Sequence, residues 1–183
     1  MKNLFTAIVL GIVFAGVSIA QTSSQPRVNV AVVEFSPGPN APGMTYEAKR
    51  HLQASLAYAL SQSDKKFRVV DVRNTREASQ ANLAAINEGS STAAAVKLGK
   101  RLGVSYVITG IVVEYMPKGE DGFGRVILQT RLIEVATGKV KHSGETTQRS
   151  TSAMRTTNAA EMHTRTIRPA LEGLAATLAG LPL

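Results

Sequence analysis

The most constraining feature of the sequence is a long apolar run at 104–115, VSYVITGIVVEY. Its β-branched residues and near-absence of alternating polar side chains predict a strand that is covered on both faces. After a polar turn at 117–124, residues 125–135 (RVILQTRLIEV) predict an answering strand. A tight turn at 136–139 places glycine where positive φ is needed, and residues 139–150 (KVKHSGETTQRS) follow as a polar, edge-like strand. This half of the chain therefore predicts an antiparallel meander.

Upstream of this run, apolar strands alternate with helical patterns. Valine-rich residues 27–35 predict a short strand, and the three prolines and two glycines of 36–43 predict a loop. Thr45 is the expected cap of a helix that continues to about residue 62. A second short strand is expected at 67–72.

Three further helices complete the pattern. A weaker, alanine-rich helix is expected from residue 74 or 75 to Gly89, and another from Thr92 to Gly103. The apolar spacing of 167–181 predicts an amphipathic C-terminal helix that Pro169 either kinks or begins. The order β-α-β-α-α-β-β-β-α predicts an α/β fold, a three-layer-like α/β sandwich with a mixed sheet.

The N-terminus has the features of an export signal. A positive start is followed by an apolar stretch at 4–17, and small residues Ser18 and Ala20 occupy the positions that a signal peptidase recognises. The alternative is an uncleaved anchor, although the apolar stretch is at the short limit for spanning a bilayer. We therefore expect residues 1–20 to be a signal peptide, 21–27 a short polar lead-in and 28–183 a single domain. The protein is expected to be periplasmic, without a transmembrane span in the mature chain.

Cysteine is absent from the sequence. This excludes a disulfide scaffold, a thiol nucleophile, cysteine-ligated zinc and a lipoprotein anchored through its own cysteine. Tethering to the outer membrane by another protein is left open.

Residues capable of catalysis do not form a recognisable motif. His51, His142 and His163 are far apart in sequence, and a zinc site would need three or four converging ligands. His51 lies beside Lys49 and Arg50, which favours a solvated surface histidine. No G-x-S-x-G elbow or phosphate-binding glycine loop is present. We therefore expect a protein that is not an enzyme, with no catalytic residue, metal site or cofactor.

Basic residues exceed acidic ones by 21 to 13, which gives a formal net charge of +8. Few aromatics are available for base stacking, so nucleic acid is not an expected partner. An acidic protein, a cell-wall polymer or the anionic head groups of a membrane surface fits better, and a merely soluble surface is the alternative. The candidate partner surface comprises the basic residues of the C-terminal third: Lys139, Lys141, Arg149, Arg155, Arg165 and Arg168.

Four segments together resemble the CsgG family, which includes the curli secretion channel subunit, and the related LpoB-like activators of penicillin-binding proteins. They are VAVVEF at 30–35, FRVVDVRN at 67–74, AAAVKLGKRLGVSYVITGIVVEY at 93–115 and VILQTRLIEVATGKV at 126–140. Their order matches the family's over nearly all of the expected mature chain. The more specific matches are Gly103, Gly110, Thr137 and Gly138, whose expected roles are structural. The resemblance implies a protein that acts by assembly and contact.

Two features depart from that family pattern. Its members are typically lipoproteins held by an N-terminal cysteine, and this chain has none. The channel subunit also carries long hairpins that form a transmembrane barrel, whereas the connections at 117–124 and 136–139 are too short to supply such strands. The sequence thus resembles the soluble core of the family.

The leading hypothesis is an exported, non-catalytic accessory protein that binds another envelope protein in secretion or assembly, such as curli assembly. A regulator of a peptidoglycan synthase, by analogy with the LpoB-like proteins, is the alternative. A small-ligand-binding or hydrolytic envelope protein with a cleft near the 36–43 loop is a further one. A homo-oligomer is compatible with all three hypotheses.

Overall fold

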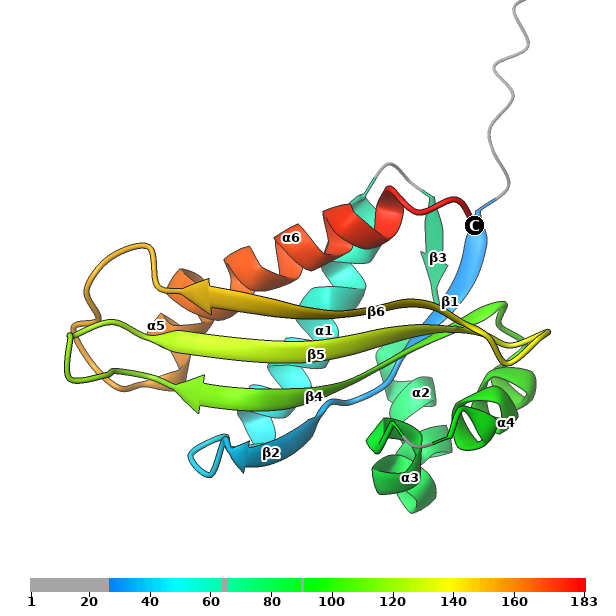
Figure 1. Ribbon diagram of the computed structural model, residues 1–183, viewed down its shortest axis with the longest axis horizontal. Coiled ribbons are helices and arrows are strands. Elements are labelled where there is room, and N and C mark those ends of the chain that lie inside the picture. The colour runs from blue at the N-terminus through cyan, green and yellow to red at the C-terminus, as the bar shows by residue number, and fades with distance from the viewer. Residues whose placement is uncertain (1–26, 64–65, 90) are drawn as a thin grey trace, which may run out of the picture.

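The computed structural model describes residues 27–63, 66–89 and 91–183, so the expected signal peptide and its cleavage residues lie outside the described part of the chain. A mixed sheet forms the centre of the fold (Figure 1), with strand order β3-β1-β4-β5-β6 and β2 paired to β4. Its strands are β1 (Val28–Val32), β2 (Ser36–Asn40), β3 (Phe67–Val69), β4 (Tyr106–Met116), β5 (Arg125–Glu134) and β6 (Val140–Arg149).

Strand β4 organises this sheet. Its first residues run parallel to β1, its later residues run parallel to β2, and its other edge is antiparallel to β5 along nearly its whole length. Strand β6 then pairs antiparallel with β5 and completes the predicted meander. The apolar run that dominates the sequence is therefore the strand with the most neighbours, as burial on both faces requires.

Two helices lie side by side on one face of the sheet and form its larger core. Helix α1 (Tyr46–Gln62) directs Leu52, Leu56 and Leu60 into the sheet, and α6 (Arg168–Ala179) directs Leu171, Leu174 and Leu178 there. These leucines recur every three or four residues, so each helix presents a single apolar face. In Figure 1 the strands β4 to β6 pass in front of α1, and α6 runs above β6.

The opposite face of the sheet is covered at one end. Helices α2 (Val72–Ser79), α3 (Leu83–Asn87) and α4 (Ala93–Leu102), with a 3₁₀ turn at Gln80–Asn82, pack there around Ala31, Val107 and Ile133. The sandwich has three layers at this end and two layers along the rest of the meander. The predicted three-layer arrangement is thus confirmed for one part of the sheet.

Residues 36–43 were predicted as a loop, and this prediction was wrong for 36–40, which form β2 despite Pro37 and Pro39. Proline is tolerated there because β2 lies at the edge of the sheet, where a missing N–H leaves no neighbouring strand unpaired. The predicted strand at 67–72 was too long, because β3 ends at Val69. Asp71 then caps α2 by accepting hydrogen bonds from the backbone N–H groups of Arg73 and Asn74.

The C-terminal helix also differs from its prediction. A short helix, α5 (Ala159–Met162), and a π-helical turn (His163–Ile167) come before α6. Pro169 lies in the first turn of α6, which is one of the two predicted placements. The Arg165 carbonyl, four residues before it, accepts a hydrogen bond from the Thr151 N–H instead. The π-helical turn shifts the helix register, and such turns are frequent at functional sites.

The glycines matched to the CsgG family have structural roles. Gly103 ends α4 and Gly138 forms the β5–β6 turn, both with positive φ. At Gly110 a Cβ would lie 2.6 Å from the Phe35 ring and 2.7 Å from the carbonyl oxygen of Gln129, so this position needs close packing. Thr137 donates a hydrogen bond to the Glu134 carboxylate and accepts one from the Lys139 N–H, which fixes the turn.

Candidate functional site

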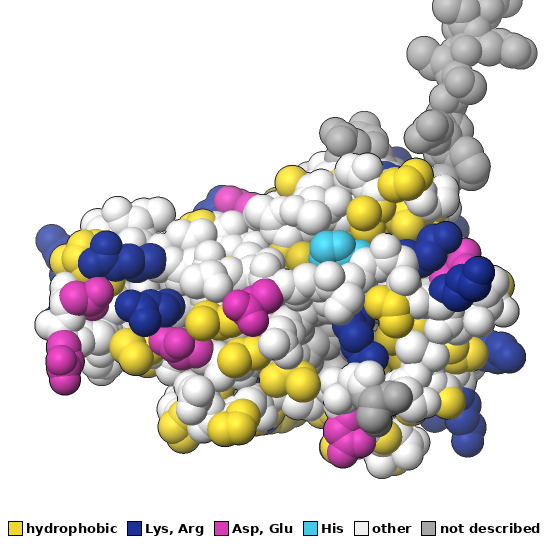
Figure 2. Space-filling view, in the orientation of Figure 1, with side chains coloured by type: hydrophobic (Ala, Val, Ile, Leu, Met, Phe, Trp, Pro, Cys, Tyr) yellow, Lys and Arg dark blue, Asp and Glu magenta, His cyan; other side chains and the backbone are white. Residues whose placement is uncertain are grey.

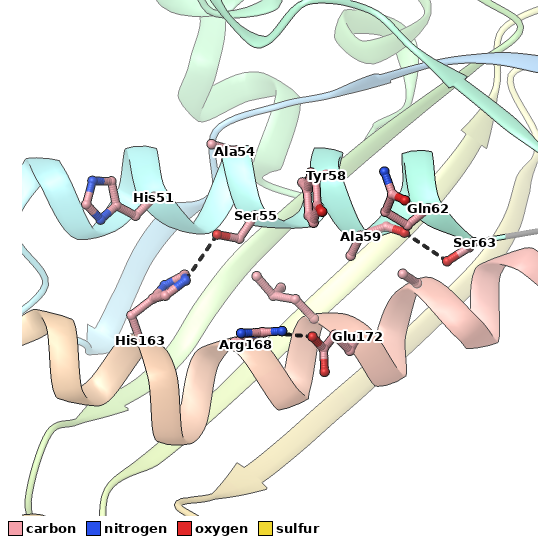
Figure 3. A pocket seen from close by; sticks show the side chains of 12 residues that line it. His51, Ala54, Ser55, Tyr58, Ala59, Gln62, Ser63, His163, Arg168 and Glu172 are labelled. Atoms are coloured by element: carbon pink, nitrogen blue, oxygen red, sulfur yellow. Dashed lines mark hydrogen bonds and ion pairs between the residues drawn. The ribbon is translucent and has the colours of Figure 1, made fainter. Parts of the chain in front are cut away.

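A groove of about 740 Å³ lies between α1 and α6 (Figure 3), on the helices' surface away from the sheet. It falls in the size range of ligand and peptide sites. None of its lining residues comes from the 36–43 segment, where a cleft was hypothesised. The lining residues are His51, Ala54, Ser55, Tyr58, Ala59, Gln62, Ser63, His163, Arg168, Leu171, Glu172 and Ala175.

The spacing of residues on α1 explains how the groove is built. Its core leucines occupy one stripe, and His51, Ser55 and Ala59, four residues apart, form the adjacent stripe that faces α6. Several of the side chains that line the space between the two helices are small, including Ala54 on α1 and Ala175 on α6. A groove therefore remains where larger side chains would close the contact.

Two histidines meet at one end of the groove. Their ring centroids lie 6.1 Å apart in an edge-to-face arrangement, with His51 on α1 and His163 at the start of the π-helical turn. The hydroxyl of Ser55 and Nε2 of His163 are 3.2 Å apart and share a hydrogen bond. Burial lowers the pKa of His163 below 6.5, and the charges of His51 and Arg168 lower it further. His163 is thereby favoured as the neutral imidazole.

Arg168 and Glu172 form an ion pair on the other wall, with Nε and Oε1 2.8 Å apart. Both side chains are more than half exposed, so water screens the pair and its contribution to stability is small. The Tyr58 side chain, 69% exposed, stands at the groove's rim. The groove thus offers the Tyr58 phenol ring, the Arg168 guanidinium and two imidazoles to a binding partner.

The arrangement is suited to binding. A nucleophilic serine needs a histidine that a third group orients, and among the described residues no carboxylate contacts either ring nitrogen of His163. Within the same part of the chain, no three metal-ligating side chains gather closely enough to hold an ion.

The structure separates the six basic residues of the candidate partner surface. Lys141 and Arg149 stand near opposite ends of β6, about 26 Å apart at the usual rise of a strand. Arg155 lies in the loop before α5, Arg165 in the π-helical turn, and only Arg168 lines the groove.

Four of these six basic residues are paired with acids. Lys141 pairs with Glu134, Arg149 with Asp121, Arg165 with Glu161, and Arg168 with Glu172. Arg149 also stacks on the Phe123 ring, with 3.4 Å between its guanidinium carbon and the ring centroid. Much of the positive charge in the C-terminal third is therefore locally compensated.

The sequence prediction missed the groove. His51 was expected to be a solvated surface histidine, and it is exposed, but it also contacts a histidine that lies 112 residues away in the chain. His142, the third histidine, lies on β6 and does not line the groove. The available signal was the polar stripe of α1 beside its leucines, which does not reveal which helix faces it.

Sequence comparisons place the chain in no group: no family profile matches it, and no curated protein matches it. Solved structures do match. PelC from Paraburkholderia phytofirmans, solved as a dodecamer, is 21% identical with a TM-score of 0.52, over 82% of this chain and 89% of PelC. The lipoprotein GNA1162 from Neisseria meningitidis is 20% identical with a TM-score of 0.53, over 84% and 97%. The hypothetical protein CT253 from Chlamydia trachomatis is 13% identical with a TM-score of 0.60, over 85% and 98%.

At these identities the matches show a shared fold. They support the α/β fold that the sequence resemblance implied, and they do not support the curli channel or its secretion role. In addition, no helix within the described ranges is both long and apolar enough to cross a membrane.

Proposed function

We propose that this chain is an exported, non-catalytic accessory protein of the cell envelope that works by protein–protein contact, and that the groove between α1 and α6 is its contact site. The observation that carries the proposal is the groove itself, a built concave surface whose polar groups suit binding. Export rests on the predicted signal peptide.

The composition around the groove supports a protein partner. Tyrosine and arginine are enriched where binding energy concentrates in interfaces. Tyr58 and Arg168 occupy the groove, and Tyr46 and Arg50 lie on the exposed side of α1 with the guanidinium 5.2 Å from the ring centroid. A partner segment seated in the groove would contact both walls and bury the exposed Tyr58 ring.

The fold comparisons agree with a role in assembly at the envelope. PelC forms a dodecamer, and GNA1162 is a lipoprotein. The fold is therefore compatible with assembly, and we extend assembly, without the lipid anchor, to this chain as part of the proposal.

The basic residues of the C-terminal third remain a second proposed contact surface. Lys141, Arg149 and Arg155 represent it, because they lie outside the groove. Replacing all three with glutamate tests this surface separately from the groove.

The test is crosslinking in intact native cells that express the tagged full chain, followed by pull-down and quantitative mass spectrometry. We expect Tyr58→Ala to reduce recovery of a specific envelope protein at least tenfold, because the exposed ring contributes little to the fold. Lys97→Ala, an exposed change on α4, is the matched control and should retain the partner. The identity of that protein separates a secretion or assembly role from regulation of a cell-wall synthase.

Three results would contradict the proposal. Equal recovery by Tyr58→Ala and Lys97→Ala would remove the groove as the contact site. Loss of the partner on triple charge reversal alone would transfer the contact to the basic surface. A tagged chain that enriches no envelope protein would exclude the accessory role.

A further inference from the structure

We propose that the His51/His163 end of the groove binds a carboxylate, and that the apolar side chains beside it hold the hydrophobic neighbours of that group. This inference rests on the proposed function, because it identifies the partner as a segment in which an acidic residue is flanked by apolar ones. It assigns a chemical role to a histidine pair that no motif in the sequence marks.

The charge balance at this end favours an anion. Three groups that carry or can gain positive charge converge there: His51 from α1, His163 from the π-helical turn and Arg168 from α6. Glu172 is the one carboxylate among the groove's lining residues, and Arg168 already holds it. A carboxylate that enters between the histidines therefore meets imidazoles that can gain positive charge, and the one acid in the lining is already paired.

The hydrogen-bonding state of the pair leaves room for a ligand. The side-chain hydrogen bond of His163 is to the Ser55 hydroxyl, and His51 makes no side-chain hydrogen bond among the described residues. The exposed His51 ring can donate to an incoming carboxylate, and a hydrogen bond between charged groups is shorter and stronger than a neutral one.

Protonation couples this binding to pH. Without a ligand, burial and the neighbouring positive charges disfavour the charged form of His163. A bound carboxylate supplies the opposite charge and raises the pKa of His163. Because the liganded state then binds more protons, affinity must increase as the pH falls through the histidine range and decrease as it rises.

The opposite end of the groove accounts for the apolar part of the ligand. Ala59, Leu171 and Ala175 line it, and the Tyr58 ring stands between this end and the histidines. Leu171 and Ala175 are buried beneath the groove, so the accessible apolar surface is that of the exposed Tyr58 ring and the half-buried Ala59. A simple inorganic anion would leave this surface in contact with water, whereas a leucine beside an acidic residue would cover it.

The chain has three histidines, so ¹H–¹³C NMR of the purified protein resolves three imidazole titrations, with His142 as an internal control outside the groove. The probes are acetyl-Ala-Leu-Glu-Leu-Ala-amide, the same peptide with glutamine in place of glutamate, and octanoate. We expect the glutamate peptide to raise the pKa of His163 by about 0.5 to 1, to shift the ring resonances of His51, and to leave the His142 resonances where they are. We expect the glutamine peptide to move none of them.

Variants identify the residues responsible. His163→Gln and His51→Gln should each weaken the glutamate peptide about tenfold, and His142→Gln should leave its affinity unchanged. Equal binding of the glutamate and glutamine peptides, or equal shifts at all three histidines, would overturn the carboxylate site. If octanoate binds and the glutamate peptide does not, the carboxylate site stands but a protein segment is rejected as its ligand. The peptide titration tests the carboxylate site alone, and the pull-down tests the groove as a protein contact site. Either experiment can fail while the other succeeds, so the two proposals fail separately.

Discussion

The α1/α6 face of the sheet buries 26 of the described hydrophobic residues, whereas the α2–α4 face buries nine. Both faces draw on the same strands, since Val30 and Val32 point to the first face while Ala31 and Val33 point to the second. The larger core extends along the whole meander, and the smaller one ends where α2–α4 end. The comparison shows that the sheet and its two long helices supply most of the burial, with α2–α4 added at one end.

The remaining sheet surface therefore faces solvent. Residues Ile111, Ile127 and Gln129 lie there beyond the α2–α4 layer, in alternation with residues that point to the larger core. Figure 2 shows basic, acidic and hydrophobic side chains interspersed on the side of the molecule that faces the viewer. Such a mixture is typical of a solvated surface, which explains how β4 to β6 remain stable with one face uncovered.

Matched leucine truncations give the largest expected difference between the two cores. We expect Leu56→Ala on α1 to lower the free energy of unfolding by about 4 kcal/mol and Leu98→Ala on α4 by about 2 kcal/mol. Both leucines are buried, but the smaller core borders solvent and can collapse around the lost volume. Urea unfolding of both variants measures this difference, and a larger loss at Leu98 would show that α2–α4 carry the stability.

Three glycines sharpen the comparison with smaller effects. An alanine at Gly110 would meet the Phe35 ring and a backbone oxygen of β5, whereas at Gly99 its Cβ would meet the side chains of Val135 and Val107. We expect a loss of about 3 kcal/mol at Gly110 and a smaller one at Gly99, because a backbone oxygen yields less than valine side chains at the edge of a small core and alanine favours the helix more than glycine does. Gly173→Ala, in open space within α6, should stabilise by about 0.5 to 1 kcal/mol. Equal losses at Gly110 and Gly99 in thermal unfolding would contradict this difference.

The sequence predicted most of the larger core because its signals are local. The helix that Thr45 caps, the apolar strand and the β5–β6 turn each depend on residues close together in the chain, and each is confirmed. Edge strand β2 was missed because its residues have turn propensity, and the pairing that makes it a strand comes from β4, more than 70 residues away.

Asn87 shows why non-local features escaped prediction. Its side chain is 3% exposed, donates to the Glu34 carbonyl and the Ser36 hydroxyl, and accepts from the Gly110 N–H. It thereby accepts the hydrogen bond of a β4 backbone N–H in the gap between β1 and β2, where no strand is available to accept it. Nothing in its neighbourhood in the sequence, INEGS, indicates this role. The groove was missed for the same reason, since His51 and His163 meet only when α1 and α6 pack together.

The smallest expected effect concerns pH, and it also distinguishes the two layers. The α2–α4 segment contains no histidine, whereas His163 connects the π-helical turn to α1. Its pKa is lowered in the folded protein, so below about pH 6.5 the unfolded state binds more protons than the folded one. Its contribution to stability is therefore complete above that pH and is lost as the pH falls through the lowered value.

We expect amide hydrogen exchange in α1 and α6 to accelerate between pH 7 and pH 5 relative to α2–α4, after correction for the intrinsic pH dependence of exchange. His163→Gln should remove this difference and His142→Gln should keep it. Glu161 does not interfere in this window, because hydrogen bonds from Arg155 and Thr156 hold its pKa at about 2. A pH dependence that persists in His163→Gln would mean that another group titrates between the two helices. Because the same imidazole is proposed to meet the carboxylate, a partner that raises its pKa should also suppress the acid-induced exchange of α1 and α6, which links the stability of the larger core to occupancy of the groove.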